Sequence, residues 1–201
     1  MRTLFPKGAM VERELMITGI GGQGVQLASL VVARAAITEG REAQLFGSYG
    51  GVMRGGNTES TVVVGDGPIE APSTVGETWS AILMHHDYVE PTLFRLRPGS
   101  VVLVNSTVYE AVFDRTGYVA LDVPATDIAV EVGNIMTASM VMIGAYAAFT
   151  GLVGLPALRQ AVADSLPSYR QNHVELNVKA LEAGFGAAPE NAAPAWATVA
   201  A

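Results

Sequence analysis

The sequence predicts an α/β protein: a single domain with a Rossmann-like sheet and helices on both faces. Short apolar segments rich in Val and Ile alternate with longer segments of helical periodicity. Such strands are typical of a sheet that is covered by helices on both sides. A glycine-rich turn separates the first strand from the first helix, and the 201 residues are enough for one domain with a substantial core.

Six short apolar segments are predicted to be strands. The first leads directly into the glycine turn, and the third has the β-branched alternation of a strand. The predicted strands are Leu15–Ile20, Ala43–Phe46, Ser60–Val64, Ser80–Met84, Val101–Val104 and Tyr118–Val123. Pro98-Gly99 is expected to form a turn before the fifth strand.

The remaining periodic segments predict helices. Gln23–Thr38 has apolar residues around nearly its whole circumference, so we expect it to be buried on more than one side. In the helix predicted over Tyr88–Leu96, Pro91 occupies the first turn, where its missing N–H does no harm. The other predicted helices are Thr126–Val132, Met136–Phe149, Pro156–Leu166 and Asn172–Ala183. Asn134 and Asn177 are candidates for polar caps or interface contacts.

The two ends are predicted to lie outside the domain, which spans residues 15–186. Residues 1–14 form an N-terminal extension that lacks the apolar core of a signal peptide. Residues 187–201 are rich in Ala and Pro and have no periodicity, so we expect them to be disordered or to lie across a partner. No segment reaches the roughly 18 consecutive apolar residues of a membrane span. A cytoplasmic location without a membrane partner is therefore expected.

The composition excludes several functions. The net charge is −7 and the only lysines are Lys7 and Lys179, which disfavours binding to nucleic acid. The absence of Cys excludes disulfides, thiolate nucleophiles and Cys-ligated zinc or iron–sulfur clusters in this chain. Only 15% of the residues are charged, whereas soluble domains typically have about 25%. This shortfall indicates that part of the surface is buried against partner chains.

The glycine turn has the spacing of a phosphate-binding motif. Gly19, Gly21 and Gly24 fit G-x-G-x-x-G, which provides a tight turn and brings a pyrophosphate close to a helix N-terminus. An NAD site also requires an acidic residue at the end of the second strand, and the predicted strand ends without one. This disfavours NAD. A different phosphate-bearing ligand, a loop or carboxylate of a partner, and simple packing by the glycines stay open.

A second glycine-rich segment, Ser48–Gly56, follows the second predicted strand. Two glycine pairs bracket Arg54, and Gly55 and Gly56 are the pair that follows it. Such pairs permit unusual backbone angles and expose amide groups. The Arg54 guanidinium suits a phosphate or carboxylate, and Tyr49 could stack on or hydrogen-bond a ligand. The alternative is a flexible crossover loop with a surface arginine.

His85 and His86 follow the fourth predicted strand. Because neighbouring side chains on a strand point to opposite faces, we do not expect them to share a metal. A structural role is the preferred interpretation, and an acid–base pair of Asp87 and Glu90 is the alternative. The sequence therefore predicts neither a catalytic residue nor a metal site in this chain.

The two glycine segments resemble those of a known family. Gly19–Val25, Tyr49-Gly50 and Arg54–Gly56 are similar to the gamma subunit, or gamma domain, of the 2-oxoacid:acceptor (ferredoxin) oxidoreductases, and the resemblance spans roughly residues 14–186. It implies an enzyme that decarboxylates a 2-oxoacid on thiamine diphosphate, passes electrons through iron–sulfur clusters and forms an acyl-CoA. The thiamine diphosphate and the clusters would lie mainly on alpha, beta and iron–sulfur partner subunits, in agreement with the absence of Cys here.

The resemblance also implies a role for this chain in coenzyme A binding or gating and in subunit assembly, without activity of the isolated chain. The residues expected nearest the ligand are Gly19, Gly21, Gly22, Gln23, Gly24, Tyr49, Arg54, Gly55 and Gly56. Two alternatives remain open at this point. The chain could be a purely structural assembly subunit, or a stand-alone dinucleotide-binding oxidoreductase.

Overall fold

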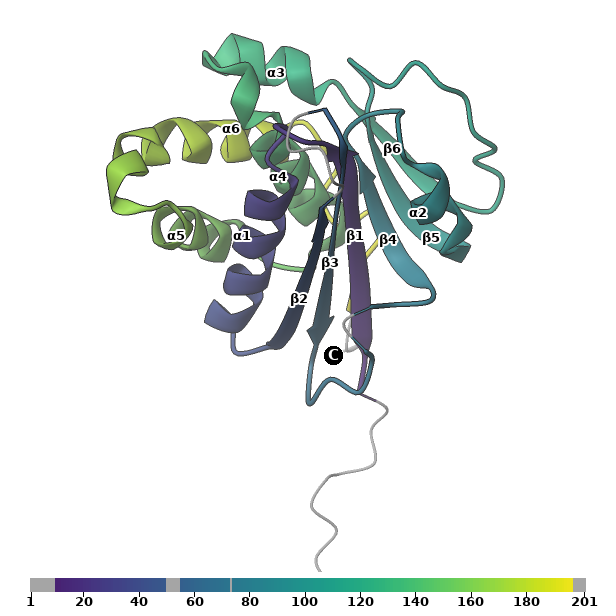
Figure 1. Cartoon of the computed structure of the whole chain (residues 1–201). Coiled ribbons are helices and arrows are strands. Elements are labelled where there is room, and N and C mark those ends of the chain that lie inside the picture. The colour runs from purple at the N-terminus through teal and green to yellow at the C-terminus, as the bar shows by residue number, and fades with distance from the viewer. Residues whose placement is uncertain (1–9, 50–54, 73, 197–201) are drawn as a thin grey trace, which may run out of the picture.

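The computed structural model describes residues 10–49, 55–72 and 74–196, which form an α/β domain around a six-stranded sheet (Figure 1). The strand order is β2-β3-β1-β4-β5-β6. The strands are β1 (Glu12–Ile20), β2 (Glu42–Tyr49), β3 (Asn57–Gly65), β4 (Thr78–Leu83), β5 (Leu96–Asn105) and β6 (Val119–Val123). The prediction of a single α/β domain is confirmed.

The sheet is mixed rather than wholly parallel. β1, β4, β5 and β6 run parallel to one another, whereas β3 pairs antiparallel with both β1 and β2. The hairpin partner β3 therefore lies between β1 and β2. In consequence, the end of β2 is separated from the glycine turn after β1 by a whole strand.

The helices cover the two faces of the sheet unequally. They are α1 (Val25–Thr38), α2 (Glu90–Phe94), α3 (Ala125–Val132), α4 (Ala138–Thr150), α5 (Leu155–Ser165) and α6 (Val174–Gly186), with 3-10 helices η1 (Ile135–Thr137) and η2 (Ser168–His173). Figure 1 shows α1, α4, α5 and α6 on one side and the short α2 on the other. Helices thus lie on both faces as expected, but the helix on the second face, α2, is only five residues long.

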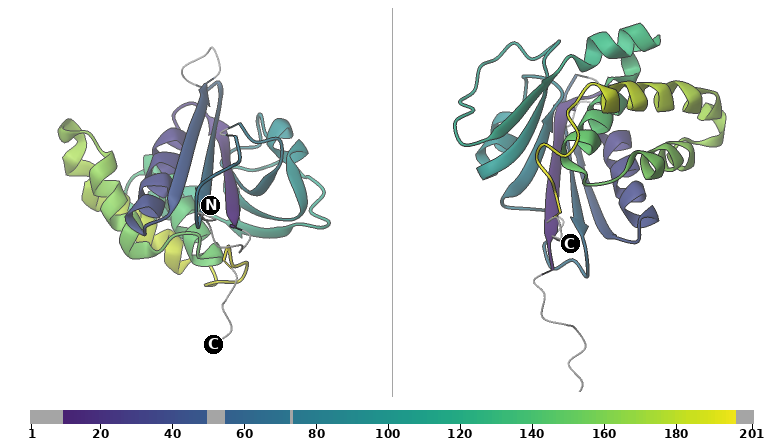
Figure 2. Two further views of the ribbon diagram at one scale, coloured as in Figure 1. Left: turned by 90° about the horizontal axis from the view of Figure 1, so that it is seen from below. Right: turned by 180° about the vertical axis from the view of Figure 1, so that it is seen from behind.

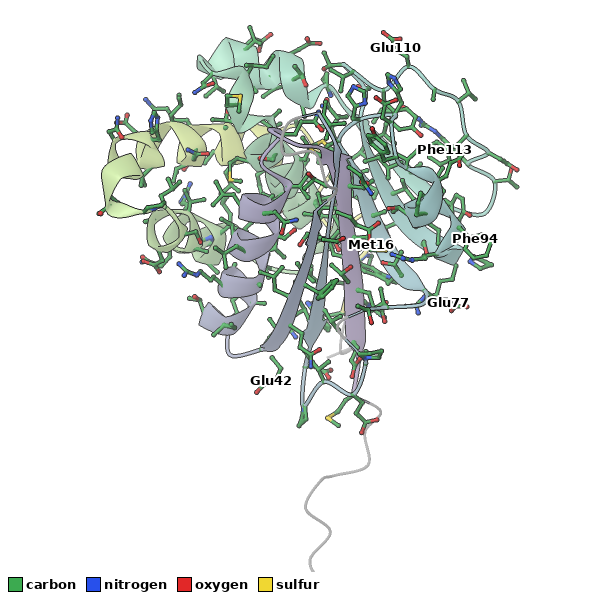
Figure 3. The ribbon with its side chains drawn as sticks, in the orientation of Figure 1. Met16, Glu42, Glu77, Phe94, Glu110 and Phe113 are labelled. Atoms are coloured by element: carbon green, nitrogen blue, oxygen red, sulfur yellow. The ribbon has the colours of Figure 1, made fainter. Side chains whose placement is uncertain are left out.

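Alternation along the strands explains why both faces are buried. Leu15 and Ile17 of β1 pack into the large core beneath α1 and α4, whereas Met16 joins a smaller cluster on the opposite face. Figure 3 labels Met16 on this strand. Burial on both sides requires near-continuous apolar strands. This is the pattern from which the strands were predicted.

Two predicted boundaries need correction. Pro98-Gly99 does not precede β5 but lies inside it, where Gly99 has φ +84° and the register with β4 shifts. The segment predicted as one helix over Met136–Phe149 begins as η1 and continues as α4. The Asn134 side chain accepts a hydrogen bond from the Met136 amide at 2.9 Å. Its prediction as a polar cap is confirmed.

The expectation for the C-terminal segment is wrong over residues 187–196, which pack on the domain itself. The amides of Asn191, Ala193 and Ala195 donate to carbonyl oxygens of Ala148, Phe149 and Thr150, at 2.7–3.0 Å. Figure 2 shows this yellow segment running back across the domain after α6. The order comes from main-chain hydrogen bonds, which composition does not reveal. In the described part of the chain, no helix combines the length and apolar character needed to cross a bilayer.

Candidate functional site

The two glycine segments meet in space. The Gly21 amide donates to the Gly56 carbonyl at 2.8 Å, and the Gly55 amide donates to the Gly21 carbonyl at 3.2 Å. The turn after β1 and the entry to β3 are thereby joined by a reciprocal pair of main-chain bonds. Arg54 lies outside the described residues, as does the side chain of Tyr49, which ends β2.

Two glycines of the turn have backbone angles that L-residues rarely adopt. Gly22 has φ +111°, and Gly24, the N-cap of α1, has φ +77°. A Cβ on Gly24 would also lie 2.6 Å from the Ser139 hydroxyl of α4. Glycine is therefore required at both positions, and the second lets α1 begin directly against α4.

The Gln23 side chain packs against Gly19 beneath the turn. The Gln23 side chain accepts a hydrogen bond from the Ile20 amide at 2.9 Å and donates to the Met84 carbonyl at 3.2 Å. It occupies the space in which a Cβ of Gly19 would lie, and a Cβ there would also be 2.9 Å from Met84. Gly19 does not line the pocket described next, and its role in the structure is to allow this close packing.

A pocket of about 760 Å³ opens beside the turn, at the carboxyl end of β1. Its walls come from the glycine turn, the first turn of α1, the start of β3, and the segments around α3 and η1. Its lining residues are Ile20, Gly21, Gly22, Gln23, Gly24, Val25, Gln26, Leu27, Thr58, Val108, Thr126, Ile135, Met136 and Ala138. None of these residues carries a charge.

The N-terminus of α1 supplies the polar character of the pocket. The first intrahelical bond is donated by Ala28 to the Gly24 carbonyl, and no side chain caps the helix. The amides of Val25, Gln26 and Leu27 therefore have no intrahelical acceptor. Together with the positive end of the helix dipole, they form a site that suits an anionic group such as a phosphate.

The opposite wall depends on a residue that was not among the predicted site residues, Asn105. Its buried side chain donates to the Met84 carbonyl at 3.3 Å and to the Thr126 hydroxyl at 2.9 Å, and accepts from the Thr126 amide at 3.2 Å. It thus caps α3 and ties it to the end of β4. The sequence places Asn105 directly after a predicted strand, but its partners come from distant elements.

Apolar groups complete this wall and its rim. Ile135 and Met136 of η1 are 55% and 60% exposed, so large apolar side chains stand at the mouth of the pocket. The pocket thus combines amide donors at one end with apolar walls at the other. Such a site suits an elongated ligand that carries a phosphate and a less polar arm.

The prediction that the His85 and His86 side chains diverge is wrong. Their ring centroids are 4.3 Å apart, and the Asp87 carboxylate lies within 3.7 Å of both rings. β4 ends at Leu83, so the alternation of a strand no longer applies to these residues.

The fold and the glycine turn define an α/β domain with a pocket at the carboxyl end of its first strand, beside the uncapped N-terminus of α1. Residues 14–187 match the family model described as pyruvate ferredoxin/flavodoxin oxidoreductase, and the chain belongs to this family.

Similar proteins include 2-oxoglutarate synthase subunits KorC. The one from Methanocaldococcus jannaschii is 32% identical, over 90% of this chain and 96% of its own length. The one from Methanothermobacter thermautotrophicus is 36% identical, over 87% and 94%. A solved structure of a keto/oxoacid ferredoxin oxidoreductase gamma subunit from Geobacter sulfurreducens has a TM-score of 0.74 and 30% identity, covering 88% of this chain and 98% of that chain.

Proposed function

We propose that this chain is the gamma subunit of a multi-subunit 2-oxoacid oxidoreductase and that its glycine-lined pocket receives part of coenzyme A. The complex would convert a 2-oxoacid and coenzyme A to an acyl-CoA, CO2 and a reduced acceptor. Support for the subunit role comes from the KorC relatives, which the match covers almost from end to end.

The observation that carries the coenzyme A assignment is the uncapped N-terminus of α1 in a pocket of about 760 Å³. Coenzyme A has phosphates at its nucleotide end and an uncharged pantetheine arm that ends in the thiol to which the acyl group is transferred. The free amides of Val25, Gln26 and Leu27 match a phosphate, and the apolar rim matches the arm. In this arrangement the chain binds and orients the acyl acceptor.

The other cofactors would lie on partner chains. This chain has no Cys with which to ligate an iron–sulfur cluster. We therefore assign thiamine diphosphate to alpha and beta subunits and the clusters to an iron–sulfur subunit, in a complex located in the cytoplasm. The isolated chain is expected to be inactive and to purify with larger subunits when these are co-expressed.

Replacement of Arg54 in the intact complex tests the coenzyme A assignment. The loss of a charge-assisted contact costs roughly 1.5–3 kcal/mol, so Arg54→Ala should raise the KM for coenzyme A at least about tenfold. Arg159→Ala is the matched control. It removes an exposed ion pair between Arg159 of α5 and Glu182 of α6, and it should leave this KM unchanged. An intact Arg54→Ala complex with an unchanged KM would instead support a purely structural subunit.

The topology argues against the dinucleotide alternative. In a dinucleotide-binding sheet the ribose is held at the end of the strand next to β1. Here that neighbour is the antiparallel β3, and β2 lies at the sheet edge beyond it. Titration of the isolated chain with NAD and NADP should therefore show no saturable binding.

A further inference from the structure

The turn that follows β4 brings two imidazoles to one carboxylate. His85 Nδ1 lies 3.5 Å from Asp87 Oδ2, and His86 Nε2 lies 3.7 Å from Asp87 Oδ1. The three ligand atoms lie within 4.8 Å of one another, and both rings are part-buried whereas Asp87 is exposed. Both distances exceed those of a hydrogen bond. The carboxylate therefore faces both nitrogens without bonding to either.

The neighbouring hydrogen bonds decide where the imidazole protons are. His86 Nδ1 lies 3.1 Å from the Val108 carbonyl oxygen, which can only accept, so Nδ1 carries a proton and the neutral ring has its lone pair on Nε2. The Asp87 amide donates to His85 Nδ1 at 3.1 Å, so the single lone pair of this nitrogen accepts that N–H. The His86 Nε2 lone pair and the Asp87 carboxylate thus lie near His85 Nδ1, and a cation bound among them would replace the Asp87 amide as the partner of His85 Nδ1.

The geometry points to a site for a divalent transition metal of the zinc class, held by His85 Nδ1, His86 Nε2 and the Asp87 carboxylate. Zinc binds imidazole nitrogen at roughly 2.0–2.1 Å and carboxylate oxygen at roughly 2.0–2.2 Å, which places tetrahedral ligands about 3.3–3.5 Å apart. The two His–Asp separations, 3.5 Å to Oδ2 and 3.7 Å to Oδ1, are near this value, and the widest separation in the set, up to 4.8 Å, closes by side-chain rotation when the metal binds. The metal takes over the His85 lone pair that the Asp87 amide shares, and its fourth position stays open to water.

The surroundings of the turn are those of a supported site. The His86–Val108 bond is the kind of outer contact that orients a metal-binding imidazole, and the Tyr109 ring packs edge-on against His86. Tyr109 and Phe113 belong to the loop between β5 and β6, in which Figure 3 labels Phe113. His86 and Asp87 also line a second pocket of about 380 Å³ with Asn57, whose buried Oδ1 has no partner among the described residues.

A bound metal would have a structural consequence. The His86–Val108 bond already joins the β4–α2 turn to the β5–β6 loop, and a metal on His86 would fix this imidazole; Val108 also lines the first pocket. The metal site would therefore be linked through Val108 to one wall of the proposed coenzyme A pocket. It does not depend on the identity of the ligand in that pocket.

Metal titration of the tag-free full chain, after treatment with a chelator, tests the inference. We expect Zn²⁺ to bind saturably at one ion per chain and to raise the Tm, and Co²⁺ to give the visible bands of a low-coordinate site. His86→Ala and Asp87→Asn should each weaken the Zn²⁺ affinity at least about tenfold. His173→Ala removes the third histidine of the chain, which is exposed and lies before α6, and should leave the affinity unchanged.

The two variants guard against a folding artefact, because Asp87 is 56% exposed and its amide analogue has nearly the same size. Loss of Zn²⁺ binding in Asp87→Asn with an unchanged circular dichroism spectrum supports the site. Absence of saturable Zn²⁺ binding by the unmodified chain overturns it. So does binding that persists in both variants, since the ion would then be held elsewhere.

Discussion

The Gly21 amide donates a hydrogen bond of 2.8 Å to the carbonyl oxygen of Gly56, and Gly21 in turn accepts one from the Gly55 amide at 3.2 Å. This reciprocal pair holds the turn after β1 against the start of β3. The amides at the start of α1 consequently line a pocket whose shape depends on both glycine segments.

Gly22 should be needed for coenzyme A binding in the pocket as well as for the stability of the fold. Gly22 (φ +111°) and Gly40 (φ +79°) both have open space where a Cβ would lie, but only Gly22 lines the pocket. Alanine at either position should cost about 1–2 kcal/mol in the free energy of unfolding, because of its positive φ. Only Gly22→Ala should also raise the KM of the complex for coenzyme A. An equal rise in Gly40→Ala would show that the effect is one of stability.

The crossing of α4 and α6 should depend on Gly184. A Cβ at Gly184 would collide with the Val141 carbonyl, and one at Gly144 with the Leu181 carbonyl. Gly184→Ala should therefore lower the free energy of unfolding by at least about 2 kcal/mol in urea denaturation. Gly186→Ala, at an open position of the same helix, is the control. It should be neutral or slightly stabilising, since alanine favours helix. Similar losses in both variants would contradict the close crossing.

Tyr146 should contribute to the loss of stability in alkali. Burial raises the pKa of the fully buried Tyr146 phenol, whose oxygen lies 2.8 Å from the Ser80 hydroxyl. Above roughly pH 10 the phenol ionises in the unfolded chain but stays protonated in the folded one. The unfolded state then binds fewer protons, so stability falls as the pH rises.

Tyr146→Phe removes this contribution. Its free energy of unfolding should be about 0.5–1.5 kcal/mol lower at neutral pH, because the hydrogen bond to Ser80 is lost. It should then decline less steeply than that of the unmodified chain above pH 10, as urea titrations at several pH values would show. Tyr88→Phe, at a half-exposed position, serves as the control. A parallel decline in the Tyr146→Phe and unmodified chains would contradict the assignment.

Trp196 should anchor the C-terminal segment to the domain. Its indole N–H donates to the Leu152 carbonyl at 3.1 Å, and its ring centroid lies 3.7 Å from the Arg41 guanidinium carbon. The carbonyl of the neighbouring Ala195 accepts a hydrogen bond from Arg13 Nε at 2.6 Å. Trp196→Ala should cost about 3 kcal/mol in the free energy of unfolding, mainly through lost packing. Trp196→Phe keeps a ring against Arg41 and should cost less. Unchanged stability in both would mean that the segment is not anchored in solution.

The local elements, and those parts of the site that depend on neighbouring residues, can be predicted from the sequence. The apolar runs of β1 and β5 and the periodicity of α1 depend on neighbouring residues, so they are readable without the fold. The need for Gly22 and Gly24 is local as well, because a positive φ restricts the residue at that position alone. The position of the glycine turn and the cap at Asn134 could be predicted for this reason.

How these parts combine is visible in the folded chain alone. The position of β3 between β1 and β2, the bonds from Asn105 to α3 and the packing of residues 187–196 join segments that are distant in sequence. The same holds for the orientation of His86 by Val108. Such contacts depend on the order of the strands and on partners that are distant in sequence, and those of residues 187–196 are main-chain hydrogen bonds that any residue except proline can donate. They therefore leave no pattern in the sequence, although they shape the pocket and the turn after β4 that contains His85 and His86.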